Sequence, residues 1–128
     1  MSKHNIMVVD DSRVVYAEMK KMLEGSEFEI IGFCRSGEEA LEQYQKIQPE
    51  LVTLDIVMPG MDGLETCEKL REKFPDAQIF MVSSMAYDDM IDRAVALGAK
   101  GFLFKPFTKE SLLEGLQGAI KAISATKN

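Results

Sequence analysis

The sequence predicts an α/β protein in which five strands, each followed by a helix, form a parallel sheet. Three observations lead to this fold class. Short runs of apolar, largely β-branched residues alternate five times with longer stretches whose apolar residues recur at helical spacing. The connections are short, which favours right-handed crossovers and helices on both faces of the sheet. Several of the apolar runs also stop at a charged or hydroxyl residue.

The predicted strands are apolar and lie at residues 6–9, 28–33, 51–54, 79–82 and 101–104. The run from Leu51 to Leu54 is typical of a strand that is buried on both faces, and it ends in a single carboxylate, Asp55. In open α/β sheets, ligands bind at the edge where the carboxyl ends of the strands lie. We therefore expect functional side chains at that edge.

Capping residues mark the helix starts, and Gly or Pro marks the ends. Ser36 opens an S-x-x-E capping box that closes at Glu39, and Asp62 followed by Glu65 gives a similar signal. Thr108 can cap the last helix. We expect helices at about residues 15–25, 37–48, 63–74, 87–97 and 109–123.

Length and composition indicate one domain over residues 1–128, with no second or output domain. The contents of 46% hydrophobic and 28% charged residues are those of an ordinary globular protein, and no apolar run approaches a membrane span. A formal charge of −6 argues against nucleic acid as a partner. Cys34 and Cys67 lack metal-site or redox spacing. We expect a cytoplasmic monomer with protein partners and reduced cysteines.

The residues at the strand ends carry most of the chemical information. The first strand ends in Asp10 and Asp11, the third in Asp55, the fourth in Ser83 and the fifth in Lys105. Two carboxylates a few ångströms apart repel each other by ~4 kcal/mol at an effective dielectric constant of about 20. Three acids converging on one sheet edge would therefore need a cation, and all-oxygen ligands with room for water suit Mg²⁺.

Each of these residues has an ordinary interpretation when taken alone. A single Asp would be a helix cap or a solvated loop residue, Lys105 a surface charge and Ser83 a turn residue. Their joint occurrence at the carboxyl ends of four predicted strands favours a functional site.

The motifs also point to a family. VVDDS at residues 8–12, LDIVMPGMDG at 54–63, VSS at 82–84 and FLFKPF at 102–107 resemble, as a set, the receiver domain of two-component response regulators. The resemblance covers essentially the whole chain, whose length is similar to that of the CheY-type single-domain regulators of chemotaxis. It implies the flavodoxin-like, doubly wound (βα)5 fold with strand order 2-1-3-4-5; this order comes from the family and not from the strand patterns.

The resemblance implies a role for each strand-end residue. Asp55 would accept a phosphoryl group from a histidine kinase, while Asp10, Asp11, Asp55 and the backbone carbonyl of Val57 would hold Mg²⁺. Lys105 and Ser83 would contact the phosphoryl oxygens. Such a domain is a signalling phosphoacceptor that assists its own Mg²⁺-dependent phosphorylation and dephosphorylation, and not an enzyme in the usual sense.

The family comparison also implies a switch and a phosphate lifetime. Ser83 would move toward the phosphoryl group and leave space for the Phe102 ring to turn inward, repacking the face made by the fourth helix, fifth strand and fifth helix. Phe102 occupies a position where many relatives carry Tyr. With Phe at this position, the chain resembles the branch of the family found in Gram-positive-type chemotaxis systems. Val57 and Met85 stand at the two positions that influence attack by water; since neither can orient a water molecule, we expect slow self-dephosphorylation.

The expected target is the flagellar motor switch protein, with a phosphatase as a further partner, and a phosphorelay carrier is the alternative role. Three other classes fit less well. A hydrolase of the haloacid-dehalogenase type needs a second Asp where Val57 stands. A flavodoxin-like FMN carrier would not place Asp10 and Asp11 in its phosphate loop. A degenerate receiver used only for binding would not need the complete acidic set.

Overall fold

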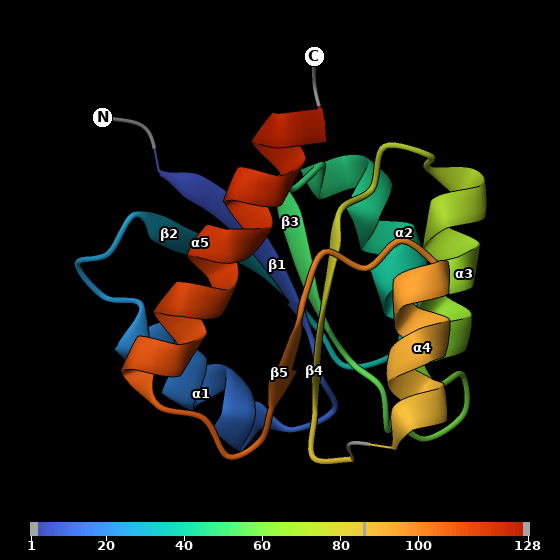
Figure 1. Cartoon of the computed structure of the whole chain (residues 1–128), viewed down its shortest axis with the longest axis horizontal. Coiled ribbons are helices and arrows are strands. Elements are labelled where there is room, and N and C mark those ends of the chain that lie inside the picture. Colours follow the sequence, from blue (N-terminus) through green and yellow to red (C-terminus); the bar gives the residue numbers. More distant parts are fainter. Residues whose placement is uncertain (1–2, 86, 127–128) are drawn as a thin grey trace.

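The computed structural model describes residues 3–85 and 87–126. Within them, five strands form one parallel sheet in the order β2-β1-β3-β4-β5, and each strand is followed by one helix (Figure 1). The elements are β1 (His4–Val9), α1 (Arg13–Met22), β2 (Phe28–Cys34), α2 (Gly37–Ile47), β3 (Leu51–Asp55), α3 (Gly63–Lys73), β4 (Ile79–Ser83), α4 (Asp88–Ala96), β5 (Phe102–Phe104) and α5 (Lys109–Thr126). The predicted fold class and the strand order implied by the resemblance are both confirmed.

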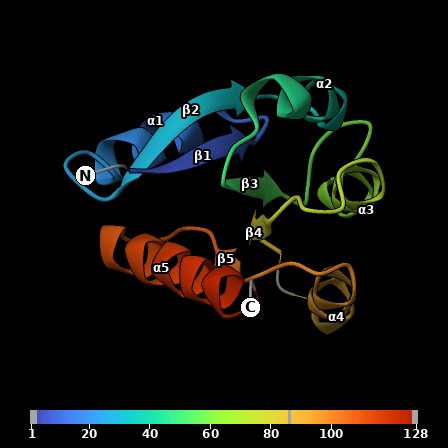
Figure 2. The same cartoon turned by 90° about the horizontal axis from the view of Figure 1, so that it is seen from above.

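Helices cover both faces of the sheet, with α1 and α5 on one face and α2, α3 and α4 on the other (Figure 2). Alternate residues of each central strand enter the two cores, because successive side chains of a strand point to opposite faces. On β1, Val8 packs in the core with α1 and α5, and Val9 packs in the core with α2 and α3. Burial on both faces explains why the strand sequences are almost continuously apolar.

The strand boundaries differ from the predicted ones by one or two residues. β1 begins at His4, whose N–H donates to the Glu27 carbonyl at 2.7 Å, and β2 extends to Cys34. β3 and β4 each include the polar residue at their end, Asp55 or Ser83. β5 begins at Phe102 instead of the predicted residue 101. Such differences are common where ladder hydrogen bonds begin or end.

Three predicted helix caps are confirmed. The N–H of Glu39 donates to Ser36 Oγ at 3.1 Å, and the N–H of Glu65 donates to Asp62 Oδ1 at 2.9 Å. Thr108 Oγ1 accepts from the third residue of α5 at 3.0 Å. The first helix differs from its prediction: Ser12 caps it, so it starts at residue 13, and it ends at residue 22.

Both cysteines are buried and free, as predicted. Burial raises the pKa of the Cys34 thiol to about 12 and that of Cys67 to about 11, so both thiols are protonated at neutral pH. Among the residues described, no helix is long and apolar enough to span a membrane.

Candidate functional site

The predicted site residues lie together at the carboxyl edge of the sheet. The register pairs Val9 with Leu54 and Asp55 with Val82, so the three central strands end at a similar level. Asp10 therefore follows β1 close to where Asp55 ends β3. Lys105 follows β5 on the same edge, and its N–H donates to the Ser83 carbonyl at 2.9 Å.

Three carboxylates form a tight acidic cluster at this edge. One carboxylate oxygen from each of Asp10, Asp11 and Asp55 lies within 4.8 Å of the other two. Asp10 is 2% exposed and Asp55 is 4% exposed, while Asp11 is partly exposed. Since burial removes the water that would screen these charges, the cluster requires a compensating cation.

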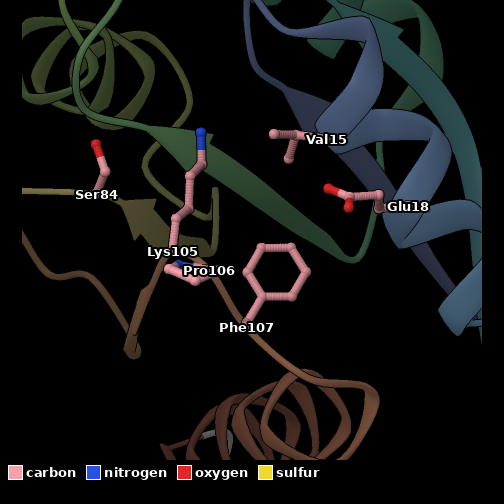
Figure 3. Close-up of a pocket in the computed structure, with 6 residues that line it drawn as sticks. All are labelled: Val15, Glu18, Ser84, Lys105, Pro106 and Phe107. Atoms are coloured by element: carbon pink, nitrogen blue, oxygen red, sulfur yellow. The ribbon is translucent and has the colours of Figure 1, made fainter.

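The Lys105 ammonium supplies part of that compensation. Its Nζ donates to Asp10 Oδ2 at 2.9 Å and lies 3.4 Å from Asp55 Oδ2. Figure 3 shows its side chain extending away from Pro106 with the amino nitrogen at the far end. One ammonium between two buried carboxylates still leaves an excess of negative charge.

The pKa values of Asp55 and Lys105 reflect this balance. Burial, and then the Asp10 charge, raise the pKa of Asp55 to about 6, although Lys105 acts in the opposite direction. Burial lowers the pKa of Lys105, but the hydrogen bond to Asp10 and the charges of both carboxylates outweigh it and raise the pKa above its ordinary value. At neutral pH, Asp55 is therefore mainly ionised and Lys105 is protonated.

Local hydrogen bonds orient the side chains at the strand ends. Asp10 Oδ1 accepts from the Ser12 N–H at 2.9 Å, and Asp55 Oδ1 accepts from the Val57 N–H at 3.3 Å. Ser83 is fully buried, and its Oγ accepts from the N–H of Met85 at 3.1 Å. Each side chain thus bonds the backbone two residues ahead, which holds the loop start against the site.

The donor set fits Mg²⁺. Three hard carboxylate oxygen donors lie close enough together to bind one ion. The single ammonium group does not neutralise all of their negative charge. No nitrogen or sulfur donor belongs to the cluster among the described residues, so softer metals have no preferred ligand. Asp10, Asp11 and Asp55 are the side chains that would hold the ion, and the role of the Val57 carbonyl stays a prediction.

A second group of exposed apolar residues lies on α4 and β5. The half-buried Phe102 ring packs against the core under α4, 5.1 Å between centroids from the ring of Phe104. Tyr87, Val95 and Phe104 are 59%, 67% and 48% exposed. A cavity of about 210 Å³ at the C-terminal end of α4 and the start of β5 is lined by Ala94, Val95, Ala99, Lys100, Gly101 and Phe102. We call this surface the α4–β5 face.

A second cavity, of about 260 Å³, lies between α1 and the loop after β5. Figure 3 shows its lining residues: Val15, Glu18, Ser84, Lys105, Pro106 and Phe107. Lys105 thus connects this cavity with the acidic cluster. Sequence reasoning missed the cavity, because Val15 carried only a core-helix signal and Glu18 carried none.

Comparison with known proteins agrees with this geometry. The family model described as "Response regulator receiver domain" matches residues 6–117. The chemotaxis protein CheY of Listeria monocytogenes is 38% identical over 116 residues, covering 91% of this chain and 98% of that protein. The corresponding protein of Bacillus subtilis is 35% identical over 113 residues, covering 88% of this chain and 94% of that protein.

Solved structures give the same result. CheY in the CheX–CheY–BeF3–Mg²⁺ complex of Borrelia burgdorferi is similar to this chain with a TM-score of 0.86 and 27% identity, covering 96% of this chain and 90% of that one. CheY4 of Vibrio cholerae has a TM-score of 0.80 and 30% identity, covering 91% and 98%. The chain therefore belongs to the response regulator receiver domain family, as a receiver domain of the CheY type.

Proposed function

We propose that this protein is a cytoplasmic phosphoacceptor switch whose phosphorylated residue is Asp55. The observation that carries the proposal is a buried, mainly ionised carboxylate held beside two further acids and an ammonium group. A carboxylate in this setting is a competent nucleophile toward phosphorus, provided that the negative charge around it is neutralised.

In the proposed step, an Asp55 oxygen attacks the phosphorus of a phosphohistidine on a histidine kinase. The new O–P bond makes an aspartyl phosphate, the P–N bond breaks, and the bond electrons leave with the imidazole nitrogen. Lys105 supplies positive charge to the transferring oxygens, and the Ser83 hydroxyl donates a hydrogen bond to one of them. When bound, Mg²⁺ would neutralise negative charge on the acids and the phosphoryl oxygens.

The two cavities support separate roles for the two sides of the molecule. Lys105 lines one cavity and also contacts the proposed nucleophile, which supports an approach of the donor protein from this side. The α4–β5 face exposes large apolar side chains, which is typical of a surface that binds another protein. We infer that this face, together with α5, binds the target, and that the target is the flagellar motor switch protein.

The direct test is intact-mass spectrometry after incubation with acetyl phosphate and Mg²⁺. We expect the wild-type chain to gain one phosphoryl group, and we expect no gain in Asp55→Asn or in the presence of EDTA. Asp92→Asn is the matched control, because Asp92 is exposed on α4, away from the cluster. A folded wild-type protein that gains no mass would contradict the proposal.

Phosphate lifetime tests the roles of Val57 and Met85. Neither side chain can orient an attacking water molecule, although Val57 is 47% exposed beside the site. We expect Asp55 phosphate to persist well beyond seconds in the isolated protein, and Val57→Asn to shorten its lifetime severalfold. Decay of the phosphorylated mass after removal of the phosphodonor measures both, and a lifetime of seconds in the wild type would reject the prediction.

The proposed switch predicts a signal at Phe102. Its ring packs against the core that includes Ala94 of α4, and its centroid lies 5.1 Å from that of the Phe104 ring. Movement of Ser83 toward a phosphoryl group would change that packing. The aromatic NMR signals of Phe102 should therefore shift on phosphorylation, and unchanged signals would exclude this form of switch.

A further inference from the structure

Gly63, the first residue of α3, packs against the backbone that carries Asp55. Its N–H donates to the Ile56 carbonyl at 2.7 Å. A β-carbon at Gly63 would overlap the carbonyl oxygen of Asp55, and would lie 2.5 Å from Ile56 Cα and 2.7 Å from the Asp55 carbonyl carbon. All three atoms belong to the backbone, so a larger residue could be accommodated only if the helix or the Asp55 segment moved.

Space, and not backbone freedom, explains why glycine stands here. Gly63 is helical, whereas the described glycines with positive φ are Gly25, Gly60 and Gly98. The φ and ψ angles of Gly63 would therefore suit alanine, which is also the better helix former. The glycine lowers the intrinsic stability of α3 and, in return, allows the helix to approach the end of β3.

The segment under Gly63 is the one on which the site depends. Asp55 contributes a carboxylate to the acidic cluster, and its Oδ1 accepts from the N–H of Val57. The start of α3 is itself fixed, because Asp62 caps it and the Thr66 hydroxyl donates to the Asp62 carbonyl at 2.7 Å. The capped helix start and the segment from Asp55 to Val57 thus form one packed unit.

We propose that Gly63 is a positioning residue for the metal and phosphoryl chemistry of Asp55. By bringing α3 into contact with the backbone of Asp55 and Ile56, it fixes where the Asp55 carboxylate and the Val57 carbonyl lie. Mg²⁺ tolerates little departure from octahedral geometry, so displacement of this segment weakens metal binding. The inference rests on the proposed function, since it concerns the same site.

Two matched alanine substitutions test the proposal. Gly101 precedes β5, at the opposite end of that strand from Lys105, and a β-carbon there would lie 2.6 Å from Phe80 Cε2 and 2.9 Å from Phe80 Cδ2, which are side-chain atoms of the buried core. We expect both Gly63→Ala and Gly101→Ala to lower the urea midpoint. Only Gly63→Ala should weaken Mg²⁺ binding in calorimetric titration, by at least tenfold, as loss of supporting contacts commonly does.

Two results would overturn the proposal. One is a folded Gly63→Ala protein whose Mg²⁺ dissociation constant lies within twofold of the wild-type value. The other is an equal loss of Mg²⁺ affinity in Gly101→Ala, which would assign the effect to general destabilisation.

A measurement on the wild type decides the matter if Gly63→Ala does not fold. In an NMR titration with Mg²⁺, the amide signals of Gly63 and Ile56 should shift together, with one dissociation constant, while that of Gly101 stays in place. A Gly63 amide that does not respond to saturating Mg²⁺ would reject the coupling.

These readouts need no phosphodonor, so they separate this inference from the proposed function. A wild-type protein that shows the expected Gly63 effects but gains no phosphoryl group would contradict the phosphoacceptor function alone. Normal phosphorylation with unchanged Mg²⁺ affinity in Gly63→Ala would contradict the positioning role alone.

Discussion

Two regions at the carboxyl edge of the sheet, β3 with α3 and β5 with α4, differ in how firmly they are held. All five residues of β3 are buried, and α3 buries five residues behind a capped start. By contrast, none of the three residues of β5 is fully buried, α4 buries only Ala94, and Tyr87 at its N-cap makes no side-chain capping bond. The carboxylates therefore stand on the firm side, and the exposed apolar face lies on the loosely packed side.

This difference suits a protein that must do chemistry in one place and change shape in another. Catalytic groups need fixed positions, because small displacements cost much of their effect. A surface that changes between two packings must instead be held by few contacts, since tightly packed regions open only at high free energy. In the proposed function the two requirements fall on β3 and β5, which β4 separates in the sheet.

The largest expected effect is on the free energy of unfolding and comes from the ionisation of Asp55 on the firm side. A raised carboxyl pKa means that the folded state binds the proton more tightly, so Asp55 stabilises the fold at low pH and this stability is lost as pH rises from its ordinary pKa near 3.8 to about 6. Asp55→Asn should therefore be more stable than wild type by about 3 kcal/mol at pH 7.5 without Mg²⁺, and nearly equal at pH 4. Urea unfolding in EDTA at both pH values measures this.

Asp10→Asn is the control for that experiment. Its two carboxylate oxygens already accept from the Ser12 N–H and from Lys105, so neutralising it removes favourable bonds. We expect no gain of stability at pH 7.5. An equal gain in both variants would mean that general repulsion within the cluster, and not the setting of Asp55, controls stability.

The two helix starts allow a smaller and more direct test. Removing the α3 cap with Asp62→Ala should destabilise the protein by about 1 kcal/mol, because the Glu65 N–H loses its acceptor. Tyr87→Ser should stabilise α4 by up to about 1 kcal/mol, because the extended backbone of residue 87 suits a capping hydroxyl that Tyr lacks. Thermal unfolding of the two variants compares them, and loss of stability in Tyr87→Ser would show that α4 needs the Tyr87 ring more than a cap.

The smallest expected effect comes from a substitution on α5, which belongs to neither of the two compared regions and serves as a reference for both. A β-carbon at Gly118 on α5 would meet no atom within 4 Å. Gly118→Ala should therefore stabilise the protein by ~0.7 kcal/mol through helix propensity and a less flexible unfolded chain. Urea unfolding gives the gain, and Mg²⁺ affinity should stay unchanged; a change in affinity would show that α5 also influences the site.

Much of this arrangement could be predicted from the sequence, because apolar strands that stop at polar residues specify both the sheet and its functional edge. Asp10, Asp11 and Asp55 were brought together in the structure as that argument required. The bridging position of Lys105 could not be predicted, since it depends on how far β5 lies from β3 and on side-chain reach. The role of Gly63 was hidden for another reason: its sequence context indicates a capped helix start, and only the packing shows what lies beneath it.

The ammonium of Lys105 among three carboxylates also implies an order of events. Three carboxylates and one ammonium group carry a combined formal charge of −2. A phosphoryl group carries negative charge of its own, so a donor that arrives first meets repulsion, whereas a divalent cation arriving first brings the edge close to electrical neutrality. The metal-free protein should consequently discriminate against phosphodonors at the stage of encounter, before any bond is made. In the proposed function, the concentration of the divalent cation would therefore control phosphorylation of Asp55 separately from the supply of phosphodonor.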